Sequence, residues 1–108
     1  MPVGKTKDAG WQVGVSRTVP LSPEEAWARI EDTATWLGVE ADDVRSFRPL
    51  DRIRVGWNGT IVQVALSEAR TGTKVTFHQE RMADADERER QREHWRGVLD
   101  QIFPEGRP

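Results

Sequence analysis

A two-residue turn constrains the fold of this chain more than any other feature of its sequence. Asn58-Gly59 separates two runs in which apolar and polar residues alternate, the strongest short signal for a β-hairpin. The register that follows pairs Trp57 with Thr60, Val55 with Val62, and Ile53 with Val64. Every apolar residue then lies on one face, so the turn and the hydrophobic pattern agree.

A second turn extends the hairpin to a meander of three strands. If Ala69-Arg70-Thr71-Gly72 is a four-residue loop, Leu66 faces Val75, Val64 faces Phe77, and Val62 faces Gln79. A two-residue turn at Thr71-Gly72 would slide these partners but keep the same faces. Either turn leaves a polar outer face made of Arg52, Arg54, Gln63, Ser67, Lys74, Thr76, His78 and Glu80.

The first half of the chain predicts a strand and two short helices. Trp11–Val19 alternates with a period of two, which indicates a half-buried strand, with Arg17 on the apolar side. Ser22 is placed to cap a helix that Pro23 begins, and Glu25 would complete a capping box. The stretch 33–37, ending at Gly38, predicts a second helix. Residues 39–51 are hard to interpret, with a short strand expected around 44–47, before Pro49.

A long helix is predicted at the C-terminal end. Asp84 is the expected cap, Glu87 would close a capping box, and the helix should end near Phe103, before Pro104. Its apolar stripe has helical spacing and consists of Trp95, Val98, Leu99 and Ile102. We expect this helix to cover the apolar face of the sheet, because it is the longest one.

Composition excludes several classes of protein. The 108 residues fit one domain at residues 11–103, with a flexible lead-in at 1–10 and a tail at 104–108. The net charge of −2 without a basic stripe argues against nucleic-acid binding, and the lack of cysteine excludes thiolate chemistry. The polar first residues do not resemble a signal peptide, and no apolar run could insert into a membrane. A cytoplasmic location is expected.

The order of these elements resembles a known superfamily. A strand, two helices, a meander and a long helix, with the opening stretch Val13–Trp27, resemble the helix-grip fold of the SRPBCC superfamily, which includes START domains and birch-pollen-allergen-like proteins. Thr71–Phe77 and Met82–Leu99 are more similar to bacterial homologues of the heat-shock protein 90 ATPase activator. The resemblance implies an α+β fold with an antiparallel sheet wrapped around the last helix. It also implies a sheet shortened by about one hairpin before Arg52.

Titratable residues form no convincing catalytic or metal-binding set. His78 falls on the solvent side of its strand, and His94 lies one step from the apolar stripe. Asp84 and Glu87 are explained as helix caps, and the other carboxylates of the last helix as a solvated face. We therefore predict no catalytic residue, no metal and no cofactor.

Two sets of residues are candidates for binding. Arg17, Arg88, Gln91 and Arg92 could hold an anionic head group, or Arg17 could pair at a strand end and the helix start could project into water. The aromatic set could line a pocket or simply fill the core, and consists of Trp11, Trp36, Trp57, Phe77 and Trp95.

The resemblance implies two functions. The first is a non-enzymatic module that binds a hydrophobic or amphipathic small molecule. The second is a protein-interaction or co-chaperone-like module with a filled core and no ligand cavity. Catalysis, known elsewhere in the superfamily, finds no support in these residues. An exposed sheet edge would allow a homodimer.

Overall fold

In the computed structural model the described residues are 5–6 and 10–105, with side chains described from residue 10 onward. The elements in chain order are β1 (Lys5–Thr6), β2 (Gly10–Val19), α1 (Pro23–Ile30), α2 (Thr33–Leu37), β3 (Asp43–Arg48), β4 (Arg52–Trp57), β5 (Thr60–Ala69), β6 (Gly72–Met82) and α3 (Ala85–Ile102).

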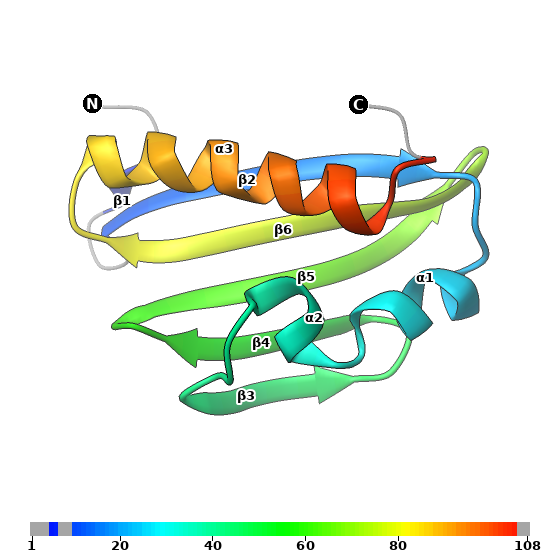
Figure 1. Cartoon of the computed structure of the whole chain (residues 1–108), viewed down its shortest axis with the longest axis horizontal. Coiled ribbons are helices and arrows are strands. Elements are labelled where there is room, and N and C mark those ends of the chain that lie inside the picture. Colours follow the sequence, from blue (N-terminus) through cyan, green and yellow to red (C-terminus); the bar gives the residue numbers. More distant parts are fainter. Residues whose placement is uncertain (1–4, 7–9, 106–108) are drawn as a thin grey trace.

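One antiparallel sheet with the helices on one face makes up the molecule. The strand order is β1-β2-β6-β5-β4-β3, so the first long strand lies beside the last one. Figure 1 shows α3 running along β2 and β6, with α1 and α2 near the other end of the strand order. The chain thus has the helix-grip fold that the sequence predicted. The sheet has six strands within the described residues, of which β1 contributes only two residues.

Both predicted turns are present, in the predicted register. Asn58 and Gly59 have φ angles of 52° and 74°, the left-handed conformation that a two-residue hairpin turn requires. The second turn has the register of the four-residue prediction, with Val64 opposite Phe77, but Ala69 pairs with Gly72, so the loop between the strands is only Arg70-Thr71. Gly72 cannot be replaced without a shift, because an added Cβ would lie 2.0 Å from the Val19 carbonyl oxygen.

The helix ends agree with the sequence except at one hydrogen bond. Ser22 and Glu25 form the predicted capping box, and α2 ends at Gly38 with φ of 83°. Asp84 caps α3 by accepting from the Glu87 N–H at 2.8 Å. The Glu87 carboxylate, however, accepts from the N–H of Ala83 rather than that of Asp84.

α3 covers part of the sheet, as expected, and α1 covers another part. α3 packs on β2 and β6, whereas α1 packs on β5 and β6. On the β3 side, the Trp27 ring of α1 meets the Phe47 ring of β3 edge-on, with centroids 5.4 Å apart. The sheet is too wide for one helix, and the two short helices cover what α3 leaves open. β3 itself occupies the stretch that was hardest to interpret.

The two termini are described only in part. Of the lead-in predicted at residues 1–10, residues 1–4 and 7–9 lie outside the described residues, while Lys5 and Thr6 pair with Trp11 and Gly10. The last described residue, Glu105, forms a two-point ion pair with Arg29 at 2.7 and 2.9 Å. No helix in the described part of the chain is long and apolar enough to cross a bilayer.

Candidate functional site

Three of the five candidate aromatic residues fill the space between α3 and the sheet. Trp36, Phe77 and Trp95 are at most 2% exposed. The Phe77 and Trp95 rings are stacked with centroids 5.2 Å apart, and the Trp36 ring lies 5.7 Å from Phe77 and 6.3 Å from Trp95. Rings in such contact leave no room between them for a ligand, so core filling is the role that these contacts support.

The polar atoms inside this core satisfy one another. Gln79, on the inner face of β6, is fully buried. Its side-chain oxygen accepts from the indole N–H of Trp95 at 2.9 Å and from the Gln91 amide at 2.8 Å. Its amide donates to the Thr60 hydroxyl, which in turn donates to the Trp57 carbonyl oxygen. These bonds give each of the buried polar side chains of Gln79, Trp95 and Thr60 at least one partner within the protein.

The other two aromatic residues lie at the margin of the core. Trp11 and Trp57 are partly buried and pack against the core cluster. The Arg88 guanidinium lies 5.6 Å above the Trp11 ring, a cation–π contact that spans β2 and α3. The aromatic set is therefore divided between core and margin.

Two arginines hold the C-terminal end of α3. Arg17 of β2 donates to the Asp100 carboxylate at 2.5 Å and weakly, at 3.5 Å, to the Phe103 carbonyl oxygen. Arg29 of α1 donates to the Ile102 carbonyl oxygen at 2.9 Å. Cations at this end of a helix are favoured by the helix dipole. Arg17 was expected either to pair at a strand end or to hold an anionic head group. These hydrogen bonds agree with the first interpretation.

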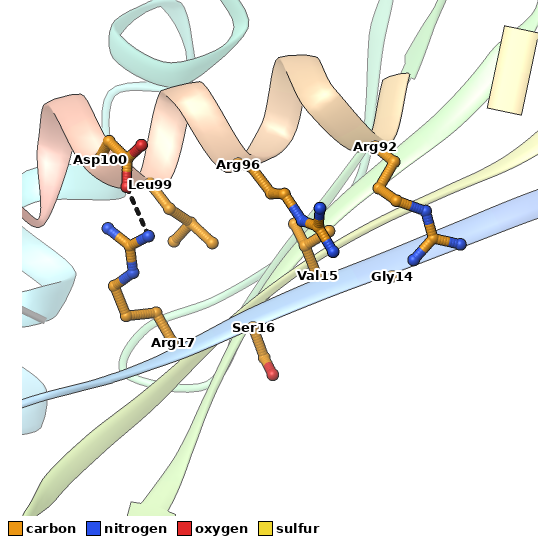
Figure 2. A pocket seen from close by; sticks show the side chains of 8 residues that line it. All are labelled: Gly14, Val15, Ser16, Arg17, Arg92, Arg96, Leu99 and Asp100. Atoms are coloured by element: carbon orange, nitrogen blue, oxygen red, sulfur yellow. Dashed lines mark hydrogen bonds and ion pairs between the residues drawn. The ribbon is translucent and has the colours of Figure 1, made fainter. Parts of the chain in front are cut away.

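A groove of about 440 Å³ opens between β2 and α3. Figure 2 shows Arg92 and Arg96 reaching from α3 toward β2, with the Arg17–Asp100 pair beyond them. Val15 and Leu99, both buried, supply apolar surface at the bottom of the groove. The lining is thus three guanidinium groups around an apolar floor, with one carboxylate that Arg17 already pairs. Such a lining attracts an anion or an acidic chain.

The groove contains only part of the predicted anion-binding set. Arg17 and Arg92 line it, whereas Gln91 is turned to Gln79 in the core and Arg88 lies over Trp11. The sequence analysis missed Arg96. The signal that could have found it is the spacing of Arg92, Arg96 and Asp100 by four residues, which places all three on one side of the helix.

The two histidines lie outside the groove. His78 is on the outer face of the sheet, where its Nε2 lies 3.1 Å from the side-chain oxygen of Gln12. Burial lowers the pKa of His78, and Glu80 and Arg54 act on it in opposite directions. His94 is exposed and meets the Trp95 ring edge-on at 4.7 Å. Within the described part of the chain, no three His, Asp or Glu side chains gather in a way that could hold a metal ion.

Comparison with known proteins supports the fold only. Neither a protein-family model nor a curated protein matches this sequence. The structure resembles the protein SSP2350 from Staphylococcus saprophyticus, with a TM-score of 0.69 over 85% of this chain and 88% of that one, at 14% identity. It also resembles CV1439 from Chromobacterium violaceum, with a TM-score of 0.67 over 84% and 94% of the two chains, at 19% identity.

A third solved structure that resembles this chain is that of an AHSA1-like protein. The AHSA1-like protein RHE_CH02687 from Rhizobium etli matches with a TM-score of 0.67 over 95% of this chain and 84% of that one, at 15% identity. The likeness agrees with the helix-grip fold, and at this level of identity it is a statement about fold alone.

Proposed function

We propose that this chain is a non-enzymatic protein-interaction module that recognises its partner at the surface rather than a carrier with an internal cavity. The observation behind this proposal is the buried contact of Trp36, Phe77 and Trp95. In a fold where the long helix closes over the sheet, an internal ligand would have to lie where these rings are. The co-chaperone-like alternative from the sequence is therefore preferred over the small-molecule carrier.

The bonded core adds to this preference. A hydrophobic ligand entering beneath α3 would separate Gln79 from Trp95 or Gln91, and each broken bond would leave a buried polar group unpaired. Such a group costs about 1–3 kcal/mol. An amphipathic small molecule would find room only in the open groove. A binding surface, in contrast, requires no change in the core.

The proposal is tested by comparing native and denaturing mass spectra of the freshly purified protein. We expect the mass of the bare polypeptide under both conditions. A long-chain fatty acid is then titrated while the indole N–H signals of Trp36 and Trp95 are followed by NMR. These signals should not move, since both indoles already donate to buried oxygens. A mass that is lost on denaturation, or a saturable shift of these two signals, would overturn the proposal.

A further inference from the structure

We infer that the groove between β2 and α3 docks an acidic, extended segment of a partner protein, which joins the open edge of β2 as an additional strand. This inference rests on the proposed function, because it names the kind of partner that the surface would recognise. It follows from three features of the groove. These are a strand edge without a neighbour among the described residues, an excess of arginine, and a spacing of Arg92 and Arg96 close to that of alternate residues in an extended chain.

Among the residues that the structure describes, the outer edge of β2 has a strand neighbour only at Gly10 and Trp11. Residues Val13–Val19 pair with β6 on one side, whereas β1 pairs only with Gly10 and Trp11 on the other. Across the described residues, no strand pairs with that second side of Val13–Val19. Every second residue of an antiparallel strand directs its N–H and C=O away from its neighbour, so along this edge a row of backbone groups has no strand partner among the described residues. Such a row is the template for strand addition.

The side chains beside this edge favour a negatively charged occupant. The ion pairs of Arg92 and Arg96 within the described residues are with carboxylates of their own helix, Glu89 at 3.4 Å and Glu93 at 3.3 Å. Exposed pairs of this kind contribute little free energy, so both guanidinium groups can turn toward a partner. Asp100 is the acid among the described residues that line the groove, and it already pairs with Arg17. The unmatched charge of the groove is therefore positive.

Helix and strand spacing determine where the partner needs its carboxylates. α3 runs alongside β2 in the same direction (Figure 1). Arg92 and Arg96 are separated by four helical residues, about 6 Å. Alternate residues of an extended chain are about 6.8 Å apart and lie on the same face. A partner strand that runs antiparallel to β2 would therefore place one acidic residue opposite Arg96 and a second, two positions later, opposite Arg92. Two positions before the first acid, beside the Arg17–Asp100 pair, it would carry a neutral residue.

The same features argue against other occupants. A second copy paired through its own β2 would bring the arginines of both grooves together, which like-charge repulsion opposes. A small anion could contact the arginines, but it would leave the backbone groups of Val13–Val19 unpaired. An acidic extended segment uses both the charge and the edge.

The test uses a blocked, fluorescently labelled peptide of sequence Thr-Val-Glu-Val-Glu-Ser, which places its acids for an antiparallel approach. Fluorescence anisotropy at low salt should show saturable binding, at least about tenfold weaker when both Glu are replaced by Gln. The double variant Arg92→Gln/Arg96→Gln should lose about tenfold in affinity. The matched control is Arg90→Gln, which removes an exposed arginine of α3 from outside the groove. It should bind as the wild type does.

Backbone methylation separates strand addition from simple anion binding. Two further peptides carry N-methyl groups on alternate sets of backbone nitrogens, so one set faces β2 and the other faces away. We expect one peptide to lose binding and the other to keep it, with slower amide exchange in Val13–Val19 on binding. Absence of binding, equal binding of both methylated peptides, or displacement by inorganic phosphate at matched ionic strength would overturn the inference. None of these outcomes changes the mass-spectrometric test of the filled core, so failure of the inference and failure of the proposed function are separable.

Discussion

The two sides of α3 differ in what they leave open. On the side facing the core, Gln91, Trp95 and Leu99 meet buried partners, and the donors of Gln91 and Trp95 reach the same oxygen of Gln79. On the side facing the β2 edge, the ion pairs that the structure describes for Arg92 and Arg96 lie within the helix, with the exposed carboxylates of Glu89 and Glu93. One helix thus closes the core with one face and borders the groove with another. The difference agrees with the proposal that this molecule recognises a partner at its surface rather than in its core.

The largest loss of stability is expected in the core beneath α3, which we call the closed side, because its packing depends on the sheet register. The side of α3 that faces the groove is the open side. Val64 is fully buried at the centre of the inner face, opposite Ile53 and Phe77. Val64→Asp would bury an unpaired carboxylate and should cost several kcal/mol, on the order of 4–5 or more. Thermal or urea unfolding measures this loss. A melting temperature close to that of the wild type would contradict the register and the packing derived from it.

A smaller loss of stability is expected when the buried hydrogen bonds of Gln79 are removed. Gln79→Leu keeps a buried side chain of similar size but removes the acceptor shared by Trp95 and Gln91 and the donor to Thr60. The free energy of unfolding should fall by about 1–3 kcal/mol. Gln63→Leu, on the outer face of the neighbouring strand, is the matched control. If both variants had the same stability, the bonds of Gln79 would contribute nothing, and the closed side would depend on apolar packing alone.

Much of the closed side was predictable because its signals are local. Asn58-Gly59 specifies a two-residue turn, and the alternation around it fixes which of Val62, Gln63 and Val64 faces the helices. Ser22 and Glu25 fix the start of α1 in the same way. In each case the residue type and the spacing act within a few positions of the chain.

The open side was predicted only in part, because its contacts join distant residues. Arg17 reaches Asp100 across 83 positions of the chain, and no periodicity within β2 reports that partner. The prediction grouped Arg88 and Gln91 with Arg17, whereas the packing of α3 turns Gln91 inward and places Arg88 over Trp11. Side-chain direction at a helix margin depends on the neighbouring elements, which the sequence of the helix alone does not contain.

A modest loss of stability is expected when the Arg17–Asp100 ion pair, at the C-terminal end of α3, is removed. Arg17→Met keeps the apolar stem but removes the bonds to Asp100 and to the Phe103 carbonyl oxygen. Because Asp100 is largely exposed, the loss should be about 1 kcal/mol or less. Urea unfolding of Arg17→Met beside Arg90→Met measures it. A loss of several kcal/mol would mean that Arg17 is a core residue rather than part of the groove lining.

The smallest effect at neutral pH is expected on the outer face, which neither side of α3 touches. His78→Ala should change the free energy of unfolding by no more than about 0.5 kcal/mol, because the side chain is half-buried and bonds only to Gln12. A large loss at neutral pH would mean that the two faces of the sheet have been assigned the wrong way round.

The contribution of His78 to the free energy of unfolding should change as the pH falls. Burial lowers its pKa below the ordinary value of 6.5, so the unfolded chain takes up a proton before the folded one does. Stability therefore falls as the pH drops below about 6.5, where the unfolded state binds more protons. His78→Gln should remove this part of the acid loss, whereas His94→Gln, at an exposed position, should keep it. Urea unfolding at closely spaced pH values measures the slope. Equal slopes for wild type and His78→Gln would show that the outer face leaves His78 as free to protonate as the unfolded chain does.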